Sequence, residues 1–177
     1  ETQLGPLTTR KRLNEVEALV EKTKQEGAKV LLGGKRPSGF NKGFYYEPTV
    51  FDNVKDDFTI MREEPFGPLV PMLSFKSFDE VIERANNNDL GLCSYICTNS
   101  MEKAHRTSEL METGTVAVNT PLVAIAEAPF GGIKQTGYGR EGGSMAIKDY
   151  LNVKYTHLGI KGWRKETYIT IEFPQSF

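Results

Sequence analysis

The strongest constraint on the fold is an alternation of helix and strand patterns between residues 77 and 119. The run Ser77-Phe78-Asp79-Glu80 has the form of a capping box, which begins a helix. The residues after it carry apolar side chains at the spacing of a core-facing helix, namely Phe78, Val81, Ile82 and Ala85. A strand at 92–98, a helix at 100–111 and a strand at 115–119 follow. Because such short connectors require right-handed crossovers, we predict an α/β fold with a mostly parallel sheet and flanking helices.

The amino-terminal part is predicted to form one helix followed by short strands. Residues 8–26 carry apolar side chains at helical spacing. Strands are predicted at 29–32, at 44–50 and at 69–75. Proline cannot donate a hydrogen bond to a neighbouring strand, so Pro48 predicts that the segment 44–50 lies at the edge of its sheet.

Charge and hydropathy argue against two classes of partner. The chain has 22 basic and 23 acidic residues and a net charge of −1, so no basic field attracts nucleic acid or an anionic membrane. No apolar run approaches the roughly 20 residues of a membrane span, and no signal peptide pattern opens the sequence. We therefore expect a cytoplasmic protein that binds neither nucleic acid nor membrane.

The two cysteines, Cys93 and Cys97, both fall in the strand predicted at 92–98. At roughly 3.3 Å per residue they lie about 13 Å apart. A disulfide needs Cα atoms within about 7 Å, and a metal ion could not bridge the larger gap. We expect two reduced, buried thiols and no metal site.

The run Glu63-Glu64-Pro65-Phe66-Gly67-Pro68-Leu69 predicts a stiff turn that presents a carboxylate beside an aromatic ring. A carboxylate can accept two hydrogen bonds from a ribose diol. A nearby ring can pack against a nicotinamide and fix its face. Two adjacent acids are also common on a solvated surface, so the turn alone leaves both interpretations open.

Residues 120–142 form a long segment without periodicity, and its low charge and its aromatic side chains favour an ordered loop. Glycines recur in and just after it, at 131, 132, 137, 139, 142 and 143. Asn119 ends a predicted parallel strand, and ligands bind beyond the carboxyl ends of such strands. We therefore expect the loop to lie over a ligand crevice, although a simple run of turns would use the same glycines.

Taken together, the turn 63–69, Asn119 and the run from Ala128 to Gly143 (APFGGIKQTGYGREGG) resemble the catalytic domain of NAD(P)-dependent aldehyde dehydrogenases. The resemblance covers residue 4 to about residue 160 and corresponds to the carboxy-terminal part of that domain. It implies a reaction in which a cysteine thiolate attacks an aldehyde and hydride passes to NAD or NADP. A glutamate-activated water then hydrolyses the thioester to the acid, and amide donors hold the oxyanion.

The resemblance also implies roles for individual residues. It places Glu64 at the nicotinamide ribose and Phe66 beside the nicotinamide ring. Around the aldehyde it implies a second set, namely Asn119, Leu122, Val123, Ala124 and Phe130. Asn119 would hold the site in position, and a strand at 151–158 would pair across a subunit interface.

The sequence departs from the family pattern at the nucleophile, because both cysteines follow Glu64 whereas the family's nucleophile precedes that motif. The chain also begins at Glu1 without methionine. We therefore expect a fragment that is inactive alone and associates with itself or with a missing amino-terminal cofactor-binding part. We expect a catalytic-domain part at 1–150, an oligomerisation strand at 151–160 and a tail of unknown role at 161–177.

Within the family the motifs look most similar to succinate-semialdehyde-type enzymes, which implies a small aldehyde substrate of the semialdehyde type. The family's loop commonly offers a hydroxyl to the substrate carboxylate, whereas Ala124 and Ile125 supply none. Two alternatives remain. One is a non-catalytic module of the same fold that binds a partner or assembles subunits. The other is a relative of acyl-phosphate reductases, which run the reverse reaction through a thioester.

Overall fold

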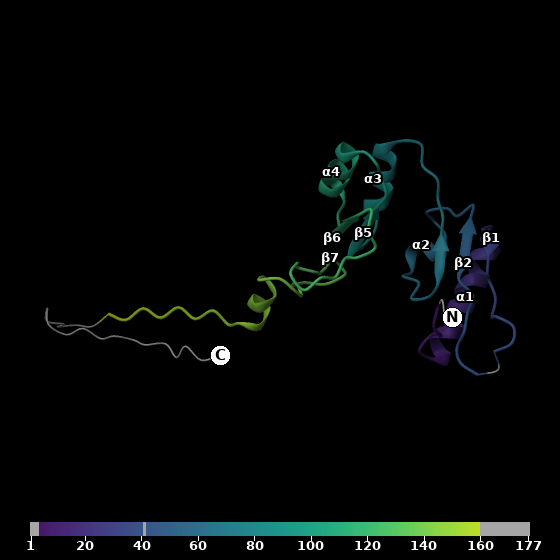
Figure 1. Cartoon of the computed structure of the whole chain (residues 1–177), viewed down its shortest axis with the longest axis horizontal. Coiled ribbons are helices and arrows are strands. Elements are labelled where there is room, and N and C mark those ends of the chain that lie inside the picture. The colour runs from purple at the N-terminus through teal and green to yellow at the C-terminus, as the bar shows by residue number, and fades with distance from the viewer. Residues whose placement is uncertain (1–3, 41, 160–177) are drawn as a thin grey trace.

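The computed structural model describes residues 4–40 and 42–159, which form two lobes and an extended carboxy-terminal segment (Figure 1). The first lobe consists of α1 (Arg10–Gln25), β1 (Lys29–Leu32), β2 (Thr49–Asp52), α2 (Thr59–Arg62) and β3 (Leu69–Pro71). The second lobe consists of α3 (Phe78–Asn86), β4 (Leu90–Gly91), β5 (Cys93–Ile96), α4 (Met101–Leu110), β6 (Thr115–Val118) and β7 (Ile133–Lys134). A short 3₁₀ helix, η1 (Ala146–Tyr150), precedes the extended segment.

Helix α1 confirms the helix predicted at 8–26. The Thr9 hydroxyl accepts a hydrogen bond from the Arg12 amide at 3.1 Å and caps the amino-terminal end. Gly27 follows the other end with a φ of +107°, a conformation that favours glycine. The buried face of the helix carries Leu13, Val16, Val20 and Thr23. One helical face therefore covers the core of the first lobe.

The sheet of the first lobe has the order β1-β2-β3, so β2 is the central strand. It pairs antiparallel with β1 and parallel with β3. The prediction of an edge strand at 44–50 is therefore wrong. Strand β2 begins directly after Pro48, so proline's missing N–H costs no ladder bond, and the Thr49 amide donates to the Pro68 carbonyl at 2.8 Å.

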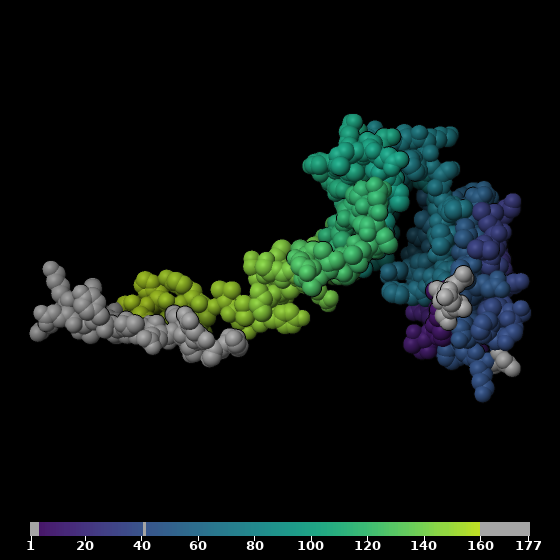
Figure 2. All heavy atoms as spheres, viewed as in Figure 1, coloured from purple at the N-terminus to yellow at the C-terminus, as the bar shows by residue number. Residues whose placement is uncertain are grey.

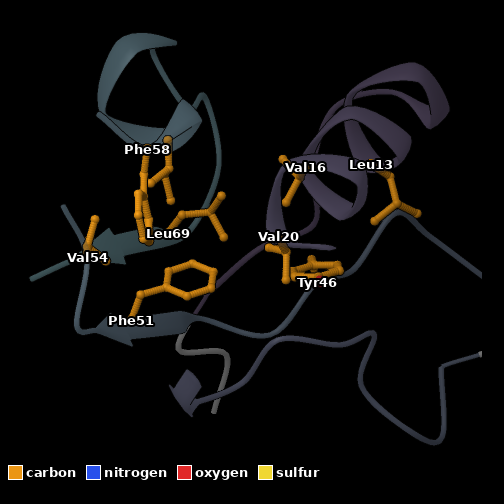
Figure 3. Close-up of a cluster of buried hydrophobic side chains, with 9 residues drawn as sticks. Leu13, Val16, Val20, Tyr46, Phe51, Val54, Phe58 and Leu69 are labelled. Atoms are coloured by element: carbon orange, nitrogen blue, oxygen red, sulfur yellow. The ribbon is translucent and has the colours of Figure 1, made fainter. Parts of the chain in front are cut away.

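A compact apolar core lies between α1, α2 and the sheet of the first lobe (Figure 3). Phe51 of β2 and Val20 of α1 are both completely buried and face one another across this core. Tyr46 lies beside them, and burial, followed by the nearby Glu17 carboxylate, raises its pKa to about 12. Tyr46 is therefore neutral at physiological pH and contributes mainly apolar contact.

The second lobe contains the predicted pair of parallel strands and the two predicted helices. Strands β5 and β6 run parallel, with Cys93 opposite Thr115 and Ile96 opposite Val118. Ser77 caps α3 through the Glu80 amide, as the capping box predicts. The predicted single, mostly parallel sheet is correct only in part, because the strands of the described residues form three separate sheets and β4 pairs antiparallel with β7.

Burial in the second lobe is much lower than in the first. Ala104 and Ala117 are its only apolar side chains, among the described residues, that are buried. The apolar face of α3 is only partly covered. Cys93 is half-buried and Cys97 is exposed, so the prediction of two buried thiols is wrong. Cys97 directly follows β5 and lines an open hollow of about 590 Å³ beside α3 and α4, so no described side chain closes over its thiol.

Beyond η1, residues 151–159 run as an exposed, extended segment that projects away from both lobes (Figure 2). The helix that precedes this segment, η1, is a single 3₁₀ element of five residues. The described part of this segment forms no strand, so the oligomerisation strand predicted at 151–160 is not confirmed. Residue 160 and the tail 161–177 lie outside the described residues. No helix in the described part of the chain is long and apolar enough to cross a membrane.

Candidate active site

The turn between α2 and β3 is built from successive tight backbone hydrogen bonds. The Phe66 amide donates to the Glu64 carbonyl at 3.1 Å, and the Gly67 amide donates to the Pro65 carbonyl at 2.7 Å. The Leu69 amide then donates to the Gly67 carbonyl at 2.8 Å. The predicted stiff turn is confirmed, and the side chains at 64 and 66 are held on a short, constrained backbone.

This turn presents an available carboxylate and an open aromatic ring. Glu64 is exposed, and within residues 4–40 and 42–159 no side chain or amide pairs with its carboxylate. The Phe66 side chain is 63% exposed. The guanidinium of Arg12 lies 5.7 Å from the centre of its ring. The carboxylate and the exposed part of the ring are therefore accessible, and these two groups are compatible with a ligand that offers a diol and a flat ring.

A groove of about 730 Å³ runs beside Phe66. Its walls come from residues 4–9, Arg12, Tyr46 and residues 65–68. Phe66 therefore lines a groove, whereas Glu64 lies on the turn outside its lining. The groove is the feature of the first lobe that could seat a flat ring against Phe66.

Helix α2 is held in place by Glu26, a residue that the sequence analysis did not single out. The Glu26 carboxylate accepts hydrogen bonds from the Thr59 hydroxyl at 2.6 Å and from the Thr59 amide at 2.9 Å. The hydrogen bond from the Thr59 hydroxyl is the largest cause that lowers the pKa of Glu26. Burial raises this pKa, whereas the bond from the Thr59 amide and the charge of Lys22 lower it further. This contact fixes the start of the short helix that leads into Glu64.

Asn119 directly follows β6 with a φ of +55°. Its side-chain oxygen accepts from the Thr98 amide at 2.9 Å, and its side-chain nitrogen donates to the Thr98 carbonyl at 2.8 Å. Its own amide donates to the Ile96 carbonyl at 2.8 Å. Because both ends of the amide bind backbone, this geometry favours the positioning role predicted for Asn119.

The segment 120–142 is an ordered loop, as predicted, with a closing pair of hydrogen bonds. Phe130 and Glu141 exchange backbone bonds of 2.7 and 2.8 Å in an antiparallel bridge. Phe130 is half-buried and lines a hollow of about 350 Å³ together with residues 136–141. Of the other predicted substrate residues, Leu122 and Ala124 are exposed and Val123 is half-buried.

The described structure thus divides the predicted site residues between the two lobes. Glu64 and Phe66 lie together on the turn of the first lobe. Asn119, Leu122, Val123, Ala124 and Phe130 lie on β6's carboxyl end and on the loop of the second lobe. Phe66 lines the groove of the first lobe, whereas Phe130 lines the hollow of the second.

Comparison with known proteins identifies the family of this chain. The Aldehyde dehydrogenase family profile matches residues 1–156. Retinal dehydrogenase 2 of Mus musculus is 46% identical over 153 residues, which is 86% of this chain and 29% of that protein. The mitochondrial succinate-semialdehyde dehydrogenase of Oryza sativa subsp. japonica is 42% identical, over 89% of this chain and 30% of that protein.

A solved structure supports the same relationship. The NAD+ complex of aldehyde dehydrogenase from Bacillus cereus superposes with a TM-score of 0.83 at 45% identity. The match covers 87% of this chain and 31% of that one, so the chain spans about a third of the length of its relatives. The chain belongs to the aldehyde dehydrogenase family.

Proposed function

We propose that this chain is the carboxy-terminal part of the catalytic domain of an enzyme that oxidises an aldehyde to a carboxylic acid with NAD or NADP. Membership of the family supports the reaction class. The observation that carries the proposal is the turn 63–69, where a Glu64 carboxylate with no partner among the described residues lies beside the exposed ring of Phe66.

On the cofactor side, the carboxylate of Glu64 accepts hydrogen bonds from the hydroxyls of the nicotinamide ribose. The ring of Phe66 packs against the nicotinamide and restricts which face it presents. When bound, the nicotinamide supplies the hydride acceptor. The turn supports this role, because its backbone hydrogen bonds hold in place the short stretch of chain that carries both side chains.

On the substrate side, the aldehyde passes along a path lined by Leu122, Val123, Ala124 and Phe130, and Asn119 holds the end of β6 in position. The exposed apolar side chains of the loop support this assignment, with Leu122 65% exposed. A semialdehyde such as succinate semialdehyde is the proposed substrate, and one relative carries that name. The test compares kcat/KM for succinate semialdehyde and for a neutral aldehyde of equal length. Equal values of kcat/KM would reject a semialdehyde as the substrate.

The nucleophilic cysteine and the general base are proposed to come from residues upstream of this chain, so the chain alone has no dehydrogenase activity. Two observations support this division. The chain spans less than a third of the length of the named relatives. Neither Cys93 nor Cys97 is among the residues that line the groove beside Phe66.

The chain then binds the missing part or a second copy, and the exposed segment 151–158 is available for that pairing. The cytoplasmic location stays a prediction.

The test uses the full-length enzyme and two adjacent acids. Glu64→Gln is expected to raise the KM for NAD or NADP by about 10- to 100-fold, because it weakens charged hydrogen bonds to the ribose. Glu63→Gln is the matched control, since Glu63 is also exposed on the same turn, and it is expected to leave KM within about twofold. Equal effects of the two substitutions would contradict the role of Glu64. An active 177-residue chain would contradict the proposed division of the active site.

A further inference from the structure

The side chain of Lys134 joins the long loop to the end of α3. Its ammonium group donates to the Asn86 carbonyl at 2.8 Å and to the Asn88 carbonyl at 2.9 Å. It also forms an ion pair of 2.6 Å with the Glu112 carboxylate. The Lys134 side chain is only 24% exposed, so this cation is largely enclosed by its partners.

These partners surround the Lys134 ammonium group at one end of the second lobe. The last carbonyls of a helix lack partners within the helix, and the helix dipole is negative there, so a cation is favoured. Asn86 ties the same point to α4, because its side chain donates to the Leu110 carbonyl and accepts from the Glu112 amide, both at 2.8 Å. Lys134 therefore binds the point at which the ends of α3 and α4 meet.

Hydrogen bonds also hold the backbone on either side of Lys134 against the second lobe. The Gln135 amide donates to the Asp89 carbonyl at 2.9 Å, and the Thr136 hydroxyl accepts from the Gly91 amide at 2.8 Å. Lys134 itself has a φ of +56°, which a non-glycine residue adopts only where its surroundings hold it. The segment after Phe130 is thus fixed to the second lobe by side-chain and backbone bonds together.

We propose that Lys134 is the positioning residue that sets where Phe130 lies in the aldehyde path. The proposal rests on the proposed function for the role of Phe130. Phe130 is four residues before Lys134 in the same loop, and Glu141, the backbone partner of Phe130, belongs to the loop as well. Lys134 therefore supplies a side-chain link from this loop to the carboxyl ends of α3 and α4.

Loss of the ammonium group leaves the two carbonyls at the end of α3 and the Glu112 carboxylate without their cation. The left-handed backbone at residue 134 then loses the side chain that holds it, and the loop moves. The first lobe, with Glu64 and Phe66, shares none of these bonds. The effect is therefore specific to the aldehyde side of the site.

The first arm of the test uses the 177-residue chain and amide hydrogen exchange. Lys134→Met is expected to speed exchange at Phe130, Gln135 and Glu141, whose amides are hydrogen-bonded in the native loop. Lys134→Arg keeps the charge and is expected to restore protection. Lys103→Met is the matched control, because Lys103 is an exposed lysine of the same lobe. Unchanged exchange in Lys134→Met would overturn the proposal.

The second arm measures steady-state kinetics of the full-length enzyme with a small and a bulky aldehyde. Lys134→Met is expected to raise the KM for the bulky aldehyde about tenfold or more while the KM for the cofactor stays within about twofold. Equal losses for aldehyde and cofactor would indicate a merely structural role and would overturn the proposal. A full-length wild-type enzyme that does not turn over aldehyde would reject the proposed function instead. Hydrogen exchange would in that case still show whether Lys134 holds Phe130 in position.

A second variant covers the case in which Lys134→Met does not fold. Glu112→Gln removes the ion pair but leaves the two bonds from Lys134 to the α3 carbonyls. It is expected to change exchange and aldehyde KM in the same direction by a smaller factor. No change in either measurement would count against the positioning role.

Discussion

The guanidinium group of Arg84 binds both carboxylate oxygens of Asp56, with Nε–Oδ2 at 2.9 Å and Nη2–Oδ1 at 3.0 Å. Its Nη1 atom donates to the Ser74 carbonyl at 2.8 Å and to Glu80 at 2.9 Å. Arg84 belongs to α3 in the second lobe, whereas Asp56 precedes α2 in the first. This bidentate pair therefore links the lobe of Glu64 and Phe66 to the lobe of Phe130.

Replacing Arg84 by methionine should loosen the segment that connects the two lobes. The change removes the bond to the Ser74 carbonyl as well as the pair with Asp56. Limited proteolysis with trypsin, followed by mass spectrometry, is expected to show cleavage after Lys76 several-fold faster than in the wild type.

The matched control for this experiment is Arg62→Met, because Arg62 is exposed and forms no ion pair with the described residues. Cleavage after Lys76 should not change in that variant. Equal rates in Arg84→Met and wild type would show that the pair with Asp56 does not hold the lobes together.

The contact between Glu26 and Thr59 predicts a stability that falls in acid. The hydrogen bond from the Thr59 hydroxyl lowers the Glu26 pKa in the folded state. The unfolded chain therefore binds a proton more readily, and the stabilisation is present above the ordinary Glu pKa of about 4.3. It is lost as the pH falls below that value through the folded pKa. The Tm difference between wild type and Glu26→Gln should be largest near neutral pH and shrink toward pH 3.

Glu83→Gln is the control for this titration, since Glu83 is an exposed acid on α3 that forms no ion pair with the described residues. Its Tm should follow that of the wild type at every pH. A Glu26→Gln difference that is constant from pH 7 to pH 3 would argue that the contact does not depend on the carboxylate charge.

Phe51→Ala should strongly destabilise the first lobe, because Phe51 is completely buried at the centre of its core. The expected loss in the free energy of unfolding is about 3–5 kcal/mol, which combines lost apolar burial with a cavity. Urea unfolding measures it. Val70→Ala on the neighbouring strand is the comparison, because Val70 is 52% exposed, and it should cost less than about 1 kcal/mol. Similar losses in the two variants would contradict the described core.

Gly114→Ala tests how closely the loop approaches the start of β6. A Cβ atom at Gly114 would overlap the carbonyl oxygen of Gly131, and neither backbone can yield without moving Phe130. The expected cost is about 1–3 kcal/mol of stability, measured by thermal unfolding. Gly5→Ala is the control, because no heavy atom lies within 4 Å of a Cβ built there. A neutral Gly114→Ala would show that the loop does not pack against β6.

The local elements of this protein could be predicted from the sequence because their signals lie within a few residues. The cap at Ser77 and the turn before β3 both follow from short motifs. The extent of burial could not be predicted from the same patterns. The apolar face of α3 has the spacing of a core helix, yet the described residues cover it only partly.

The chemical character of the candidate site was also readable from the sequence, since a carboxylate and a ring between prolines are a local arrangement. The contacts that hold this site in place could not be read from the sequence. Glu26 is 33 residues from Thr59, Arg84 is 28 residues from Asp56, and Lys134 is 48 residues from Asn86. Such contacts depend on how elements that are distant in the sequence pack together, within a lobe or between the two lobes.

Where α1, α3 and α4 begin and where the turn before β3 lies could be inferred from the sequence, because backbone preferences and side-chain caps act over one or two turns of chain. The central place of β2 in its sheet and the bonds from Asn119 to the backbone at Thr98 became visible only in the folded chain. The same holds for the division of the predicted cofactor residues and the predicted substrate residues between the two lobes. Strand order and long-range polar contacts follow from which apolar faces are buried together, and that choice involves the whole chain at once.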